Sequence, residues 1–121
     1  MQDFKKLRVW QDAQELTVDI YKLTACFPRE ERFGLTSQLR RASVSIGSNV
    51  AEGCKRVSPA DTAHFINIAE ASGGESISEL DVARRLRFIS EARAIEFIDR
   101  FDHIGAMLER LRQRMIGNRA R

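Results

Sequence analysis

The side chains that could perform chemistry in this chain do not form a recognisable catalytic or metal-binding pattern. Di-iron bundles use a Glu from each of two helices and two Glu-x-x-His pairs. This sequence offers a single Asp61-x-x-His64 motif, in which Asp61 is better explained as a helix cap, while Asp99 and His103 share a helix face without completing a ligand set. No nucleophile stands beside a base, and no glycine-rich loop follows a predicted strand. We therefore expect no enzymatic activity, no metal and no cofactor.

A second group of polar residues lies on or beside the apolar stripes of two predicted helices, where buried polar groups would need partners. Residues 38–53 are crowded with small side chains, which let helices approach closely, and Arg40 or Arg41 could pair with a buried carboxylate. One interpretation is a satisfied polar layer that fixes the register of the helices. The alternative is a ligand-binding cavity. The residues concerned are Asn49, Glu52, Ser72 and Glu75.

Basic residues form the third group. The net charge is +3 with a pI near 9.2, and sixteen of the twenty basic residues are arginine, which suits bidentate phosphate contacts. We expect Lys55 to lie near the basic N-terminal segment, at one end of the molecule. Solvated helix faces, or the base content of the source genome, would also produce arginine-rich sequence. The residues predicted to contact nucleic acid are Arg40, Arg41, Lys55, Arg56, Arg84, Arg85 and Arg87. Because no aromatic cluster accompanies them, base stacking is not predicted.

Four helices are predicted to position these groups, over residues 4–27, 35–53, 59–89 and 91–116. Apolar residues recur at alternating spacings of four and three along these segments, which is typical of one buried helix face. Pro28 ends the first helix, Ser58 and Pro59 begin the third, and Ser90 caps the fourth. Short connections between these helices predict an all-α, antiparallel up-down-up-down four-helix bundle that forms one domain over residues 1–121.

The cellular compartment of the protein is predicted from the length of its apolar runs and from the positions of its cysteines. No apolar run approaches the roughly 20 residues of a membrane span, and the N-terminal residues lack a signal peptide's hydrophobic region. We therefore expect a cytoplasmic protein without a membrane partner. Cys26 and Cys54 fall at opposite ends of the predicted bundle, which excludes a disulfide between them and favours reduced, unreactive thiols.

Several motifs together resemble one known family over nearly the whole chain. They are Leu7-x-Val9-Trp10-Gln11, Phe27-Pro28-x-x-Glu31, Phe33-Gly34-Leu35, Gln38-Leu39-Arg40-Arg41-Ala42, Ser45-Ile46-x-Ser48-Asn49-Val50-Ala51-Glu52-Gly53, and Phe65-Ile66-x-Ile68-Ala69 followed by Ser72-x-x-Glu75. These residues resemble the four-helix-bundle proteins encoded in the intervening sequences of bacterial 23S ribosomal RNA. The resemblance implies a homopentamer. It also implies kinship with the accessory variability proteins of diversity-generating retroelements, basic pentamers thought to bind nucleic acid and a reverse transcriptase.

The sequence thus predicts a non-enzymatic, oligomeric accessory protein that binds RNA or DNA through basic surface patches. Five copies of a chain with net charge +3 would carry about +15, enough for salt-sensitive, sequence-tolerant contacts with phosphates. The alternative is a protein-interaction scaffold that docks a partner protein and has no direct nucleic-acid role.

Overall fold

The computed structural model describes residues 3–120, with side chains for residues 3–117. Over that span the chain is all-helical, with no strand. Four helices carry the fold, as the sequence predicts, and two short 3-10 turns accompany them. In chain order the elements are η1 (Phe4–Lys6), α1 (Arg8–Thr24), η2 (Arg29–Glu31), α2 (Leu35–Cys54), α3 (Pro59–Arg85) and α4 (Glu91–Ala120).

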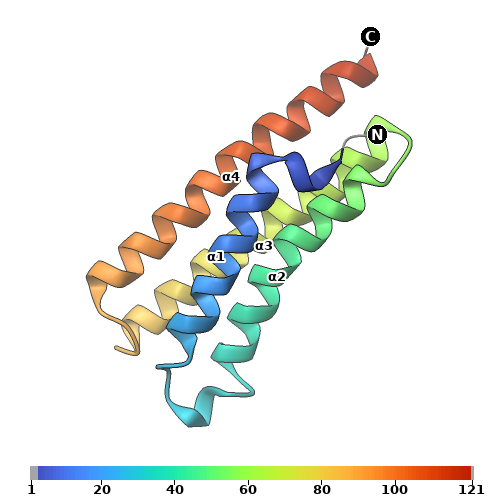
Figure 1. The fold of residues 1–121 in the computed structure, drawn as a ribbon. Coiled ribbons are helices and arrows are strands. Elements are labelled where there is room, and N and C mark those ends of the chain that lie inside the picture. The colour runs from blue at the N-terminus through green and yellow to red at the C-terminus, as the bar shows by residue number, and fades with distance from the viewer. Residues whose placement is uncertain (1–2, 121) are drawn as a thin grey trace.

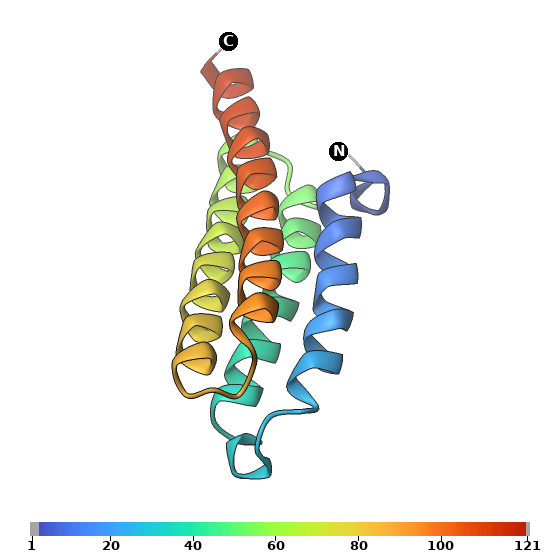
Figure 2. The same cartoon turned by 90° about the vertical axis from the view of Figure 1, so that its left-hand side faces the viewer.

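The helices pack side by side along one long axis (Figure 1). The turns joining α1 to α2 and α3 to α4 lie at one end, which we call the turn end. The start of α1, the α2–α3 connection and the last turns of α4 lie at the other, which we call the terminal end. α4 extends past the start of α1 in both views (Figure 2). Within residues 3–120, no helix combines the length and the apolarity that a membrane span requires.

The core is mainly aliphatic, with three buried phenylalanines, Phe27, Phe97 and Phe101. Its side chains come from the apolar stripes of all four helices, so the predicted spacing does identify the buried faces. Removing these side chains from water stabilises the fold. The largest fully buried ones are Phe101, Leu16, Ile20, Leu39, Ile46, Ile66, Leu80, Leu108 and Val50.

Helix starts agree with the predicted caps, with one exception. The Ser58 hydroxyl accepts a hydrogen bond from the Asp61 amide at 3.1 Å, and the Ser90 hydroxyl accepts one from the Arg93 amide at 3.1 Å. The first helix is interrupted at Leu7, whose extended backbone separates η1 from α1. α1 also ends at Thr24, a full turn before Pro28.

The third helix ends earlier than predicted. Arg87 adopts a left-handed backbone conformation (φ 64°), and the Phe88 amide then donates to the carbonyl of Ala83 at 2.9 Å. The Arg87 amide donates to the carbonyl of Arg84, which completes a Schellman motif. Glycine usually occupies the left-handed position, so an arginine there gives no sequence signal for the stop.

Close helix contacts explain several of the small residues. A Cβ placed on Gly53 would lie 3.2 Å from the Thr62 carbonyl oxygen and 3.2 Å from Phe65 Cβ, so α2 and α3 meet there almost backbone to backbone. α3 continues unbroken through Gly73, where a Cβ would lie 3.9 Å from Ile46 Cδ1. This is an ordinary van der Waals distance, so the packing around Gly73 leaves room for a Cβ and does not by itself require glycine there.

Both cysteines are free thiols. Cys26 is exposed at the turn end, while Cys54 is buried at the end of α2. Burial and the nearby Asp3 charge raise the pKa of the Cys54 thiol. A raised pKa lowers the thiolate fraction, so Cys54 is a structural residue and a poor nucleophile.

Candidate nucleic-acid interface

The α2–α3 contact contains a small polar layer. The hydroxyls of Ser45 and Ser72 lie 2.9 Å apart, and the Asn49 side-chain amide donates to the Ser45 carbonyl at 2.8 Å and to its hydroxyl at 2.9 Å. Asn49 and Ser72 are therefore brought together around Ser45, and their hydrogen-bonding groups satisfy one another. This arrangement has the properties of a layer that fixes helix register.

The two carboxylates expected near this layer lie outside it. Glu52 is exposed and pairs with Arg56 one turn along α2, on the surface. Glu75 is exposed on α3. Neither carboxylate receives an ion pair from Arg40 or Arg41 in the described part of the chain.

The buried carboxylate is Glu79, one turn beyond Glu75. Only 8% of Glu79 is exposed, and its Oε1 atom is buried without a hydrogen-bond partner among the described residues. Burial raises the pKa of Glu79 to about 7, and a hydrogen bond with Glu75 and the charge of Glu75 add to the shift. Its spacing of three from Ser76 places it on the polar face of α3, which is the sequence signal that could have identified it.

Arg40 anchors two helices to each other. Its Nε donates to the Thr24 hydroxyl at 2.8 Å, and its terminal nitrogen donates to the Tyr21 carbonyl at 3.1 Å. The guanidinium carbon also lies 4.6 Å from the centre of the Tyr21 ring. With two of its five N–H donors bound to α1, Arg40 connects α1 and α2 and has fewer donors left for a phosphate.

Two arginines at the end of α3 share one carboxylate, which offsets part of their positive charge. Arg84 and Arg85 reach Asp81 at 2.9 and 2.7 Å, and Arg84 also lies 3.9 Å from Glu91. Hydrogen bonds from Arg85 and Arg84 lower the pKa of Asp81, so the carboxylate stays charged. Of the predicted phosphate ligands at the turn end, Arg41 and Arg87 are exposed and form no ion pair with any described residue.

Lys55 and Arg56 lie at the terminal end, away from the other predicted ligands. The Lys55 ammonium is 5.8 Å from the centre of the Phe4 ring, which confirms that it lies near the N-terminal segment. Arg56 is paired with Glu52 and stacks on Phe65 at 4.7 Å. The predicted ligands thus form two separate groups, about 20 Å apart along α2 at 1.5 Å per residue.

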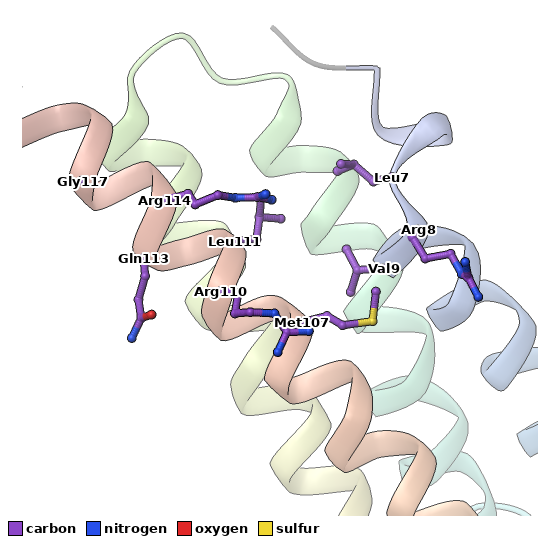
Figure 3. Close-up of a pocket in the computed structure, with 9 residues that line it drawn as sticks. All are labelled: Leu7, Arg8, Val9, Met107, Arg110, Leu111, Gln113, Arg114 and Gly117. Carbon is purple, nitrogen blue, oxygen red and sulfur yellow. The ribbon is translucent and has the colours of Figure 1, made fainter.

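A groove at the terminal end brings together residues that the sequence did not single out. It lies between the start of α1 and the last turns of α4 and has a volume of about 610 Å³ (Figure 3). Met107 reaches toward Val9 across it, while Arg110 and Arg114 extend from α4 toward α1 (Figure 3). Its lining residues are Leu7, Arg8, Val9, Met107, Arg110, Leu111, Gln113, Arg114 and Gly117.

The charge of this groove is positive. Arg110 and Arg114 are exposed and form no ion pair with the described residues, and Arg8 shares Asp12 at 3.3 Å with 79% of its side chain exposed. Arg8 extends away from α4 (Figure 3), so the free anion-binding capacity in the groove lies on its α4 side, at Arg110 and Arg114. In the same part of the chain, no three His, Cys, Asp or Glu side chains converge to hold a metal ion.

Comparison with known proteins identifies the family. Residues 5–110 match the 23S rRNA-intervening sequence protein family. The chain belongs to this family. A crystal structure from Bacteroides thetaiotaomicron VPI-5482, of a protein with unknown function from the S23 ribosomal protein family, is similar with a TM-score of 0.74. The two chains share 25% identity over 83% of this chain and 94% of that one. A search among curated proteins finds no match.

The region shared with the 23S rRNA-intervening sequence proteins includes most of the groove. Leu7, Val9, Met107 and Arg110 fall within the matched residues, while Arg114 and Gly117 lie beyond them. The family therefore accounts for the helices that form the groove, and the last turns of α4 add one of its arginines.

Proposed function

We propose that this antiparallel bundle assembles into a homopentamer in the cytoplasm and binds RNA or DNA without catalysis. The observation that supports this proposal is the pair Arg110 and Arg114, which flank a groove and have no acidic partner among the described residues. Lys5, Lys6 and Lys55 are exposed at the same end of the bundle. Together with Arg8 they form a basic surface suited to phosphate contacts.

The binding test is anisotropy of labelled oligonucleotides at 50 mM salt. The double substitution Arg110→Gln and Arg114→Gln should weaken binding about tenfold and flatten the dependence of log affinity on log salt by roughly 1.4 for a single strand. The comparison is Arg84→Gln with Arg85→Gln, which removes the same charge from two arginines that share Asp81 at the turn end and should weaken binding less. Binding that stays undetectable at 50 mM salt would contradict the proposed function.

The oligomer has an independent test. A ring repeats a weak basic patch, so several patches can contact one strand and raise its affinity. Light scattering on purified protein should give about five times the 13.8 kDa chain mass. A monomer at micromolar concentration would contradict the pentamer.

A protein-interaction scaffold is the second candidate function, and the apolar side chains inside the groove favour it. A partner protein held by apolar contacts should stay bound in 0.5 M salt, whereas phosphate contacts should be lost.

The kinship with retroelement accessory proteins is part of the proposal as well. A reverse transcriptase gene beside this one would support that kinship.

A further inference from the structure

Glu79 is a buried carboxyl group without the partners that a buried charge requires. Only 8% of the residue is exposed, and its Oε1 atom has no hydrogen-bond partner among the described residues. No described arginine or lysine forms an ion pair with it. An ionised carboxylate in such a place carries a large desolvation cost. The folded protein therefore favours a proton on this side chain, which also hydrogen-bonds with Glu75.

Glu79 lies on the side of α3 that faces α2. Seven residues make almost two helical turns, so Glu79 and Ser72 share one side of the helix. The Ser72 hydroxyl lies 2.9 Å from the hydroxyl of Ser45 on α2. Seven residues from Ser45 toward the turn end of α2 lies Gln38, which is uncharged (Figure 1). Glu79 is thus placed in the part of the α2–α3 contact nearer the turn end, opposite a neutral residue.

The charged groups around this position supply no counter-ion. Among the described elements, α3 packs against α2 and α4. Of the two basic residues of α2, Arg40 is bound to α1, and Arg41 is exposed and pairs with no described acid. The other charged pairs of these three helices are Glu52 with Arg56, Glu70 with Arg112, Asp81 with Arg84 and Arg85, Glu91 with Arg84, and Glu96 with Arg93. Glu75 is therefore the ionisable neighbour that acts on Glu79.

The two ends of the α2–α3 contact differ in what they bury. In the terminal half, residues 59–69 of α3, a Cβ on Gly53 would lie 3.2 Å from the Thr62 carbonyl oxygen, and the Thr62 hydroxyl donates to the Gly53 carbonyl at 2.9 Å. The turn-end half, residues 76–85, contains Glu79 instead. Ionisation weakens that half, because separation of the helix ends lets water reach the carboxylate without unfolding the whole bundle.

We propose that Glu75 and Glu79 form a pH-sensitive switch, in which a proton held by the pair keeps the turn-end half of α3 packed on α2, and release of that proton to water lets this half separate locally. The terminal half stays closed because Gly53 and Thr62 carry no titratable group. Glu75 is exposed, so the proton has a short path between the buried carboxyl and solvent. The switch is a local opening rather than a general loss of stability, and it does not depend on nucleic-acid binding.

The test is amide hydrogen exchange, followed residue by residue by NMR at pH 5.5 and pH 8.5. Protection factors, which correct for the intrinsic exchange rate at each pH, should fall roughly thirtyfold over residues 76–85 of the wild type, given a pKa of about 7 in the closed state and 4.5 in water. Glu79→Gln should show little change between the two pH values. The matched control is Asp102→Asn, which removes an exposed acid of α4 and should keep the wild-type response.

Urea distinguishes a local opening from global unfolding. At pH 8.5, the opening that exposes residues 76–85 should have less than about half the urea dependence of global unfolding measured by circular dichroism, because it exposes less surface. The full urea dependence at these residues would overturn the switch, and this measurement needs only the wild type. Equal protection of the wild type at both pH values, or an unchanged response in Glu79→Gln, would overturn it as well.

Discussion

The α2–α3 contact and the α1–α4 contact form opposite kinds of surface in one bundle. Between α2 and α3, glycine and serine allow near-backbone approach. The hydroxyls of Ser45 and Ser72 pair across the seam, and the Thr62 hydroxyl donates to the Gly53 carbonyl at 2.9 Å. Between α1 and α4, larger side chains leave a groove at the terminal end. The closed contact builds the bundle, and the open contact is the one available to a ligand.

Because of this difference, the residues that stand out in the sequence are not the ones that a ligand can reach in the structure. Residues 38–53 stand out by their small side chains, but most of these side chains pack α2 against α1 and α3. Arg40 shows the same outcome in part, because Thr24 and Tyr21 accept two of its five N–H donors. A basic residue becomes a candidate ligand only when no neighbouring group already uses its charge, as at Arg110 and Arg114.

The comparison predicts a large stability difference between the two contacts. Ile46→Ala should lower the free energy of unfolding by about 2–5 kcal/mol, because Ile46 is 1% exposed and packs against α3. Met107→Ala, on the groove floor, should cost less than about 1 kcal/mol because its site is already open to water. Urea denaturation measures both. Equal losses would contradict the distinction between a closed contact and an open one.

The buried Glu79 of α3 should add a pH dependence to the stability of the fold. Its pKa is about 7 in the folded chain against an ordinary value of 4.5, so the folded state binds the proton more tightly. The stability supplied by protonated Glu79 is full below pH 4.5 and is lost as pH rises through about 7, a loss of roughly 3 kcal/mol.

Glu79→Gln should therefore match the wild type near pH 4.5 and exceed its stability at pH 8, as measured by urea denaturation at the two pH values. Glu75→Gln provides the control, since it removes the neighbouring charge and should reduce the pH dependence without abolishing it. Parallel pH profiles for the wild type and Glu79→Gln would show that this carboxyl group is not the source.

A smaller effect is expected from the polar layer. Ser72→Ala removes one hydroxyl of the Ser45 pair and should cost about 1 kcal/mol, since the remaining hydroxyl keeps its contact with Asn49. The control is Ser78→Ala, an exposed serine on the same helix, with an expected change within about 0.5 kcal/mol. Thermal unfolding of the two variants gives the comparison, and equal melting temperatures would argue against a structural role for the layer.

The smallest change in stability is expected at the α1–α4 contact. Arg100 of α4 reaches Asp19 of α1 at 2.8 Å, with both side chains one-third exposed. Arg100→Gln should cost about 0.2–1 kcal/mol in dilute buffer and nothing measurable in 0.5 M salt, because exposed pairs are screened. A salt-independent loss would mean that the α1–α4 contact depends on Arg100 for packing, which Arg100→Met would restore.

Sequence spacing is enough to predict most of this fold. The alternation of four and three identifies the four buried faces, and serine caps identify where α3 and α4 begin. The end of α3 could not be predicted, because the left-handed residue that stops it is Arg87 and carries no glycine signal. The local pairing of Asp81 with Arg84 and Arg85 was readable from their helical spacing.

The groove could not be predicted in the same way. Its two sides are about a hundred positions apart in the chain, and its depth depends on how α1 and α4 are set relative to each other. No local motif encodes that relation. The availability of each arginine could not be predicted either, because a count of arginines does not show which of them an acid or a carbonyl already contacts.

The placement of the groove has a practical consequence for handling the protein. The start of α1 and the last turns of α4 both border it (Figures 1 and 3). An affinity tag or fluorescent protein fused before α1 or after α4 would therefore lie beside the candidate ligand site. The turn at residues 28–34 lies at the opposite end, and Phe33 there is 83% exposed. A short label inserted in that turn would report on binding without obstructing it.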